Sequence, residues 1–266
     1  MATKSFLGIQ FWNNSTQELL QVVDDTGGLF TVPSAPSLAM MRNDPLLTKA
    51  YQSSDWAVVD GGYVALVLRM CFGRNLPRIS GLQILQRLVG EKEKRAIPFH
   101  ERNTLWVVPS QAEKERIDYF LEDSGFSPTK RHWYFAPFYK TDADFQDEEL
   151  EKIVDDVKPD WIILCIGGGK QEKLGYYLRN ANIEKIAAAT NTNTIPRPKG
   201  PVILCTGGAI AFLTGGQANI PTWADRLYLG WLFRVLQSPR TFLPRYWNAG
   251  YEFPRLLWEW RGSLFQ

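Results

Sequence analysis

The sequence has few cysteines, no long hydrophobic run and almost no net charge. Its three cysteines, Cys71, Cys165 and Cys205, are odd in number and widely spaced, which argues against a disulfide framework or a zinc site. Two of them lie in apolar runs, so we expect buried thiols in a reducing compartment. No window of about 18 residues is apolar throughout, and the first residues lack the apolar stretch of a signal peptide, so neither a membrane span nor a leader is expected. The formal net charge of +2 gives no indication of nucleic-acid binding.

Hydrophobic residues, in contrast, make up 45% of the 266 residues, which is enough for a sizeable core. Short apolar runs alternate with helix-like segments. The expected strands lie at residues 6–12, 28–32, 55–60, 104–110, 132–138, 160–166 and 201–209. The expected helices lie at residues 15–24, 36–52, 61–73, 81–96, 111–125 and 147–159, with another after the glycines at 167–169. Repeated β-α units with nearly all-apolar strands predict an α/β fold, a Rossmann-like parallel sheet covered by helices on both faces.

In a parallel sheet of this kind, ligands bind just beyond the carboxyl ends of the strands. The residues at those positions are Thr31, Asp60, Ser110, Gly167 to Glu172 and Thr206 to Gly208. The last two turns are rich in glycine, and backbone N–H groups at such turns can hold a phosphate. Glycine also serves simply to turn the chain, and this alternative stays open. The pattern Gly-x-Gly-x-x-Gly is missing after the first strand, which argues against a dinucleotide-binding oxidoreductase.

Three segments in a fixed order carry a more specific signal. They are "VVDGGYVALVLRMCFGRNLPRISGLQIL" at 58–85, "PDWIILCIGGGKQEKL" at 159–174 and "VILCTGGAIAFLTGGQANIPTWADRLYLGWLFRVLQSPRTFLPRYW" at 202–247. Their order and gaps resemble the WecG/TagA/CpsF glycosyltransferases, known as glycosyltransferase family 26. The likeness runs over about residues 28–247, with Pro77 placed directly before Arg78 as a local difference.

The resemblance implies an enzyme of cell-surface polysaccharide synthesis. Such an enzyme moves a sugar, with inversion, from a UDP-sugar to a saccharide carried on a polyprenyl diphosphate. The resemblance further implies a Rossmann-like domain of the type called GT-E, catalysis without a metal or other cofactor, and a cytoplasmic protein that is peripheral on the inner face of the cell membrane. A homo-oligomer stays open, and no nucleic-acid partner is expected.

The resemblance also assigns roles to single residues. Asp60 matches the aspartate proposed as the base that accepts the acceptor proton, and Thr31 matches a threonine near the reacting sugars. Asp60 could instead cap the following helix, and Thr31 could be an ordinary strand-end residue. Arginines are suitable donors to the leaving diphosphate. The residues expected to bind substrate are Arg78, Gly167, Gly168, Lys170, Gln171, Glu172, Thr206, Gly207, Gly208, Arg234, Arg240 and Arg245.

Several positions depart from the family pattern. The usual Asn-Ala before Asp-Gly is Val58-Val59, and the proline of Pro-Lys-Gln-Glu is Gly169. Ala211 stands where an aspartate is expected near the nucleotide base, while Asn219 and Gly230 replace an arginine and a glutamate. These changes leave the donor sugar open. They also leave open a second function, a catalytically inactive nucleotide-sugar-binding or scaffold subunit of a polysaccharide assembly complex.

Carboxylates and histidines that could hold a metal are sparse. Asp142 and Asp144 form an Asp-x-Asp run, but it lies in a polar loop that we interpret as solvated, and His100 and His132 stand alone. No metal site is therefore expected.

The amino-acid composition of the chain changes near residue 222. We expect an α/β nucleotide-sugar-binding catalytic domain at 1–221 and a helical, aromatic and basic appendage at 222–266 that either contacts the membrane or closes the active site. Trp223, Leu227 and Trp231 form one helical stripe, and the tail is rich in tryptophan and arginine, which suits an anionic membrane surface. The alternative is that the stripe packs on the core or on a partner subunit.

Overall fold

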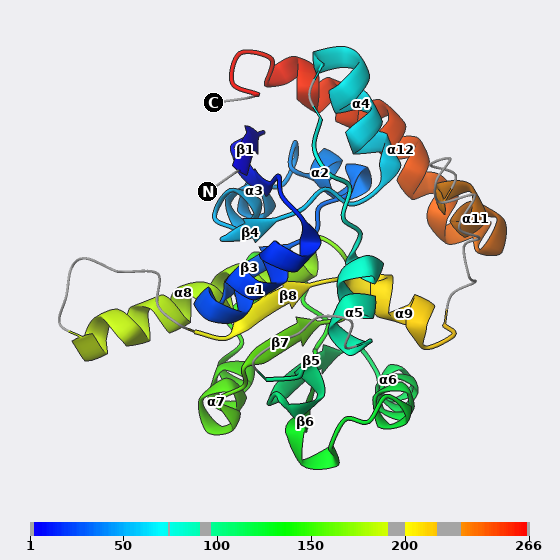
Figure 1. Ribbon diagram of the computed structural model, residues 1–266. Helices are drawn as coiled ribbons and strands as arrows, with labels where there is room; N and C mark the ends of the chain where they lie inside the picture. The colour runs from blue at the N-terminus through cyan, green and yellow to red at the C-terminus, as the bar shows by residue number, and fades with distance from the viewer. Residues whose placement is uncertain (1–2, 74, 91–96, 191–199, 217–229, 265–266) are drawn as a thin grey trace.

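The structure is a computed structural model that describes residues 3–73, 75–90, 97–190, 200–216 and 230–264. Its described strands form one eight-stranded sheet in the order β1-β2-β4-β3-β8-β7-β5-β6 (Figure 1). All neighbouring strands are parallel except β1 and β2. The strands are β1 (Thr3–Phe6), β2 (Ile9–Trp12), β3 (Gly28–Thr31), β4 (Trp56–Ala57), β5 (Thr104–Val108), β6 (Arg131–Phe135), β7 (Trp161–Leu164) and β8 (Val202–Cys205). The expected parallel α/β sheet is confirmed.

The first expected strand, at 6–12, is wrong in one respect, because a turn at Leu7 and Gly8 divides this segment between β1 and β2. β1 and β2 pair as an antiparallel hairpin around Leu7 and Gly8, which both have positive φ angles, 56° and 72°. Two positive φ values in a two-residue loop match the twist of a hairpin. The leucine at the first of these positions hides the turn from a reading of the sequence, since asparagine or glycine is usual there.

The helices cover both faces of the sheet. They are α1 (Thr16–Thr26), α2 (Ala35–Met40), α3 (Pro45–Gln52), α4 (Gly62–Phe72), α5 (Gly81–Val89), α6 (Gln111–Asp123), α7 (Glu148–Val157), α8 (Lys170–Thr190), α9 (Ile210–Leu213), α11 (Gly230–Gln237) and α12 (Pro239–Glu259). The single helix expected at 36–52 is wrong, because it is two helices. Asp44 caps the second one by accepting from the Leu47 N–H at 2.9 Å, and Pro45 takes its first position.

Successive strand residues alternate between the two faces. Trp106, Ile163 and Leu204 pack with α1, α5 and α6 on one face. Leu105, Ile162 and Ile203 pack with α7 and α8 on the other face. A separate cluster joins the N-terminal hairpin to α2, α4 and α12. Cys165 and Cys205 are buried, as expected, and Cys71 is exposed.

The described part of the C-terminal region is helical, as expected, and its two ends differ. In α12, Phe253, Leu256 and Leu257 are buried in the cluster that contains Phe6 and Ile9. The Leu7 N–H donates to the Leu264 carbonyl at 2.9 Å, so the two ends of the chain meet. The other end of α12 lies beside α11 at the carboxyl edge of the sheet (Figure 1). The stripe expected at Trp223 and Leu227 lies outside the described residues.

The chain changes direction across the sheet at the neighbouring strands β3 and β8. β4 and β2 continue the sheet on one side of β3, whereas β8, β7, β5 and β6 continue it on the other. The segments that follow β3 and β8 pack on opposite faces, since Ala50 of α3 lies in the cluster of Leu105 and Ile210 of α9 lies in the cluster of Trp106. A crevice at this point is the usual ligand site of such sheets.

Candidate active site

A cavity of about 760 Å³ lies at this point of the sheet. Its walls come from the segments that follow β3, β4 and β8, from the start of α5, and from α11 and α12. Four of the residues expected to act in the site line this one cavity: Asp60, Arg78, Arg234 and Arg245. They are far apart in the sequence, and the fold brings one carboxylate and three guanidinium groups to a shared space.

Asp60 and Arg78 are held by the backbone on the same side of the cavity. The Asp60 N–H donates to the Pro33 carbonyl at 3.0 Å, which joins the segments after β3 and β4. Val59 and Arg78 form an isolated parallel bridge, and the Ile79 N–H donates to the Val59 carbonyl at 3.1 Å. Asp60 is not the N-cap residue of the following helix, because that position of α4 is taken by Gly61.

Arg234 and Arg245 reach the cavity from the C-terminal helices. The Arg234 guanidinium lies 5.0 Å from the ring centre of Phe212, which itself lines the cavity. The Arg245 Nη2 atom lies 3.9 Å from the position that a Cβ of Gly168 would take, so this arginine reaches the glycine turn after β7. Arg240 is exposed on the same helix and is not among the residues that line the cavity.

Thr31 lies inside the sheet and away from the cavity wall. Its side chain is fully buried, and its hydroxyl donates to the Ser54 Oγ atom at 2.9 Å. Among the residues that the structure describes, the cavity wall after β3 is instead made by Ser34, Ala35 and Pro36. Thr31 therefore holds the segment behind the site, as an ordinary strand-end residue does.

The polar side chains of the turn after β7 form hydrogen bonds within the protein, where the sequence suggested contacts with a ligand. Glu172 is buried, and its Oε2 atom accepts from the Gly169 N–H at 2.6 Å, so the third residue of α8 reaches back to the N-terminus of its own helix. The Gln171 Oε1 atom accepts from the Gly207 N–H at 2.6 Å, which ties this turn to the turn after β8. Two backbone donors that could have met a phosphate are thus used inside the protein.

The glycine that replaces the family proline is required by this geometry. Gly169 has a φ angle of +87°, which proline cannot adopt because its ring fixes φ near −65°. It also supplies the N–H that donates to Glu172, a donor that proline lacks. The substitution therefore changes the turn itself. Burial raises the pKa of the Glu172 carboxyl above its ordinary value.

The remaining expected residues of the two turns differ in exposure. Gly167 and Gly208 are exposed, Gly168 is partly exposed, and the Lys170 ammonium lies 3.8 Å from the ring centre of Phe138. Thr206 is buried, and within the described part of the chain its hydroxyl has no hydrogen-bond partner. The exposed part of the two turns is therefore Gly167, Gly168 and Gly208, whereas the Thr206 hydroxyl is enclosed by the protein.

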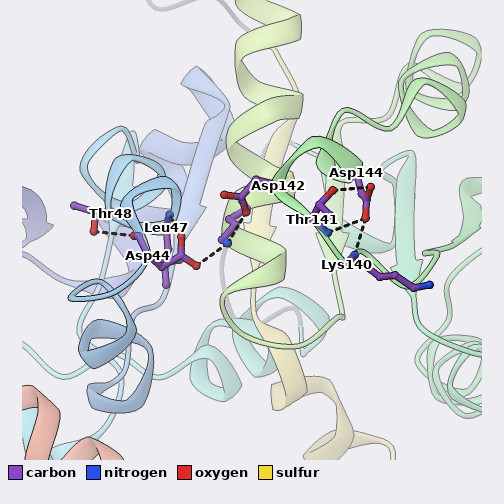
Figure 2. Close-up of polar contacts among 8 residues, drawn as sticks. Asp44, Leu47, Thr48, Lys140, Thr141, Asp142 and Asp144 are labelled. Atoms are coloured by element: carbon purple, nitrogen blue, oxygen red, sulfur yellow. Dashed lines mark hydrogen bonds and ion pairs between the residues drawn. The ribbon is translucent and has the colours of Figure 1, made fainter.

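The Asp-x-Asp run lies apart from the cavity and is engaged within the protein (Figure 2). The Asp142 carboxylate pairs with the Lys173 ammonium at 2.9 Å, and the same ammonium pairs with Asp44 at 2.6 Å. Asp144 accepts from the N–H groups of Lys140 and Thr141 at 2.6 and 2.9 Å. Over the described ranges, no group of three or more His, Cys, Asp or Glu side chains is placed to hold a metal ion.

An appendage that closes the active site was one expectation, but aromatic side chains in the cavity wall were not predicted. The sequence suggested that the tail aromatics face a membrane, yet several of them line the cavity together with Tyr63 of α4: Trp231, Phe242, Tyr246, Trp247 and Tyr251. Trp247 is nevertheless 78% exposed, so it stands at the cavity rim. The spacing of Phe242, Tyr246 and Trp247 along one helix was the available signal.

The fold and the cavity define a class, an α/β protein with a cavity at the carboxyl edge of a parallel sheet that is closed by helices carrying arginine and aromatic side chains. The sequence model of the WecG/TagA/CpsF glycosyl transferase family matches residues 4–265, and the chain belongs to this family. It is therefore a glycosyltransferase of cell-surface polysaccharide synthesis, with a nucleotide-sugar donor and a saccharide acceptor. In the comparison with curated proteins, no protein matches this sequence. No helix in the described part of the chain is long and apolar enough to cross a bilayer.

Proposed function

We propose that this protein transfers a sugar from a UDP-sugar to a saccharide carried on a lipid diphosphate, with inversion at the anomeric carbon and without a metal. The single observation that carries the proposal is the cavity shared by Asp60, Arg78, Arg234 and Arg245. One carboxylate is what an inverting transfer needs as a base, and three arginines suit a leaving diphosphate.

In the proposed reaction, the acceptor hydroxyl attacks the anomeric carbon from the face opposite the UDP. Asp60 accepts the hydroxyl proton as the new glycosidic bond forms. The bond between the anomeric carbon and the phosphate oxygen breaks, and its electron pair leaves with UDP. Guanidinium groups of Arg78, Arg234 and Arg245 stabilise the charge that develops on this oxygen and on the diphosphate.

The cavity walls carry both aromatic and arginine side chains, which suits a nucleotide-sugar donor and a saccharide acceptor. Sugars and nucleobases both pack on aromatic faces, and the side of the cavity formed by Tyr63, Phe242 and Tyr246 supplies such faces. Arg245 lies near Gly168, so it can contact a diphosphate held between the tail and the turn after β7. The donor sugar, the acceptor sugar and the linkage are not specified by these contacts.

We further propose that the protein is peripheral on the inner, cytoplasmic face of the cell membrane, where a lipid-linked acceptor resides. Large apolar side chains are exposed on α12, where Trp247, Tyr251 and Trp258 are 78%, 58% and 70% exposed. On α4, Leu66 and Met70 are also exposed. Arg255 and Arg261 stack on Tyr251 and Trp258, which places positive charge beside the aromatic groups. This combination suits an anionic lipid surface.

Transfer is tested by the release of UDP when UDP-sugars are supplied together with a short-chain polyprenyl-diphosphate saccharide. We expect acceptor-dependent release that persists in EDTA, because arginines supply the positive charge that a metal would otherwise bring. Loss of activity in EDTA that manganese restores would contradict the metal-free mechanism. Binding of UDP-sugar without any release of UDP would instead support the alternative, an inactive nucleotide-sugar-binding subunit.

A further inference from the structure

The guanidinium group of Arg234 is held by two contacts that come from different parts of the fold. Arg234 lies on α11, and its guanidinium is 5.0 Å from the ring centre of Phe212 on α9, a distance at which an aromatic face attracts a cation. Its Nη1 atom donates a long hydrogen bond of 3.4 Å to the hydroxyl of Tyr246 on α12. All three side chains line the cavity, so these contacts join the segment after β8 to both α11 and α12.

The two partners of Arg234 are themselves fixed by packing. Phe212 is buried, with 9% of its surface exposed. The Tyr246 ring stacks on Phe242, with ring centres 6.3 Å apart and planes 27° apart, and it lies 6.1 Å from the ring of Trp231. Aromatic pairs at such separations are stabilised beyond the area that they bury. The aromatic face and the hydroxyl that hold Arg234 are thus in place without a ligand.

Neither contact neutralises the charge of Arg234. Arg179, in contrast, pairs with the Asp55 carboxylate at 2.6 Å. Within the described ranges, Arg234 pairs with no carboxylate, and its partners are an aromatic ring and a neutral hydroxyl. A guanidinium group has N–H donors beyond the one that Tyr246 accepts. Arg234 is therefore a positioned cation without a counter-charge at the cavity wall, which suits a diphosphate.

We propose that Phe212 and Tyr246 are positioning residues that hold Arg234 ready to bind a diphosphate. This inference rests on the function proposed above, in which Arg234 stabilises the diphosphate of UDP. A long side chain that is free before binding loses rotamer freedom when it binds, and this loss weakens the affinity. The ring and the hydroxyl reduce this cost in advance. Both residues act through Arg234, so the effect of replacing either one should disappear when Arg234 is absent.

A double-mutant cycle tests this dependence. It compares wild type, Tyr246→Phe, Arg234→Ala and the double variant by calorimetric titration with UDP. Tyr246→Phe keeps the aromatic ring and removes only the hydroxyl. We expect Tyr246→Phe to raise the Kd for UDP roughly fivefold, Arg234→Ala to raise it about tenfold or more, and the double variant to match Arg234→Ala alone. An equal effect of Tyr246→Phe with and without Arg234 would overturn the proposal.

Two further variants separate positioning from a general loss of stability. Phe212→Leu keeps an apolar side chain and removes the ring face, and we expect its effect on the Kd also to vanish in the Arg234→Ala background. Tyr139→Phe is the control, because the Tyr139 hydroxyl donates to the Asp147 carboxylate at 2.8 Å and Tyr139 is not among the residues that line the cavity. We expect Tyr139→Phe to bind UDP as wild type does. A rise in the Kd as large as that of Tyr246→Phe would assign the effect to lost stability and overturn the proposal.

The same cycle with inorganic pyrophosphate separates this inference from the proposed function, because pyrophosphate carries the charge of a diphosphate without the nucleoside. Binding of pyrophosphate that shows coupling between Tyr246 and Arg234, together with no binding of UDP, would support the positioning and contradict the UDP-sugar donor. Binding of UDP without this coupling would keep the proposed donor and overturn the positioning. A wild-type protein that binds neither ligand would overturn both.

Discussion

The residues expected in the site divide into two groups with different partners. Asp60, Arg78, Arg234 and Arg245 face a common cavity, whereas Gln171, Glu172 and Thr31 make their hydrogen bonds within the protein. The polar side chains of the Lys-Gln-Glu turn suggested contacts with a ligand. The same side chains are equally suited to accept hydrogen bonds from buried backbone N–H groups, and Gln171 and Glu172 do so in the structure.

At the residue scale, two arginines of one helix make a direct comparison. Arg245 lines the cavity and lies near Gly168, while Arg240 is exposed and away from it. We expect Arg245→Ala to raise the Kd for UDP about tenfold, corresponding to about 1.4 kcal/mol, because a charged donor to the diphosphate is lost. Arg240→Ala should leave the Kd within experimental error. Calorimetric titration of both variants measures this, and equal effects would remove Arg245 from the diphosphate site.

At the element scale, the sequence predicts the buried strands and the long helices well. β5, β7 and β8 were recognised because both of their faces are buried, which leaves nearly continuous apolar runs. The hairpin at Leu7 was missed because no asparagine or glycine marks its first turn position. Asp44 and Pro45 mark the break between α2 and α3. The apolar residues nevertheless keep a helical spacing across the break, so the sequence predicts one helix.

The helix α12 contributes both to the core and to the proposed membrane surface, and the sequence alone does not separate these two roles. Its later part is core, with Phe253, Leu256 and Leu257 buried, so removing the chain from residue 222 would expose the rest of this cluster and would also delete the proposed membrane surface. A loss of activity in that truncated chain would not identify the cause. Single substitutions of exposed side chains avoid this problem.

A membrane-contact prediction can therefore be made for one exposed residue of this helix. Trp258 is 70% exposed, and Tyr119 on α6 is 77% exposed on a distant part of the molecule (Figure 1). We expect Trp258→Ser to reduce sedimentation with vesicles containing anionic lipid at low salt by several-fold, since tryptophan is favoured at the headgroup level. Tyr119→Ser is the control and should bind as wild type does. Full-length protein that ignores such vesicles would contradict the membrane proposal.

At the scale of the whole molecule, the site depends on the order of the strands. The segments after β3, β4 and β8 meet because these strands are neighbours, and α11 and α12 then close the cavity over them. The sequence places residues at strand ends but does not state which strands are adjacent. The likeness to a family supplied that information for Asp60 and Arg78. It did not reveal that the Tyr51 hydroxyl donates to Glu172, a residue 121 positions away.

In the proposed mechanism, Asp60 accepts the acceptor proton in a cavity whose arginines hold the UDP. The most direct test of this mechanism is UDP release by Asp60→Asn, with UDP affinity measured on the same preparation and with Asp123→Asn, an exposed carboxylate of α6, as the control. We predict that Asp60→Asn keeps its fold and its UDP affinity while turnover falls by about 10²-fold or more, because the amide cannot accept the proton. Near wild-type turnover of Asp60→Asn would contradict this account.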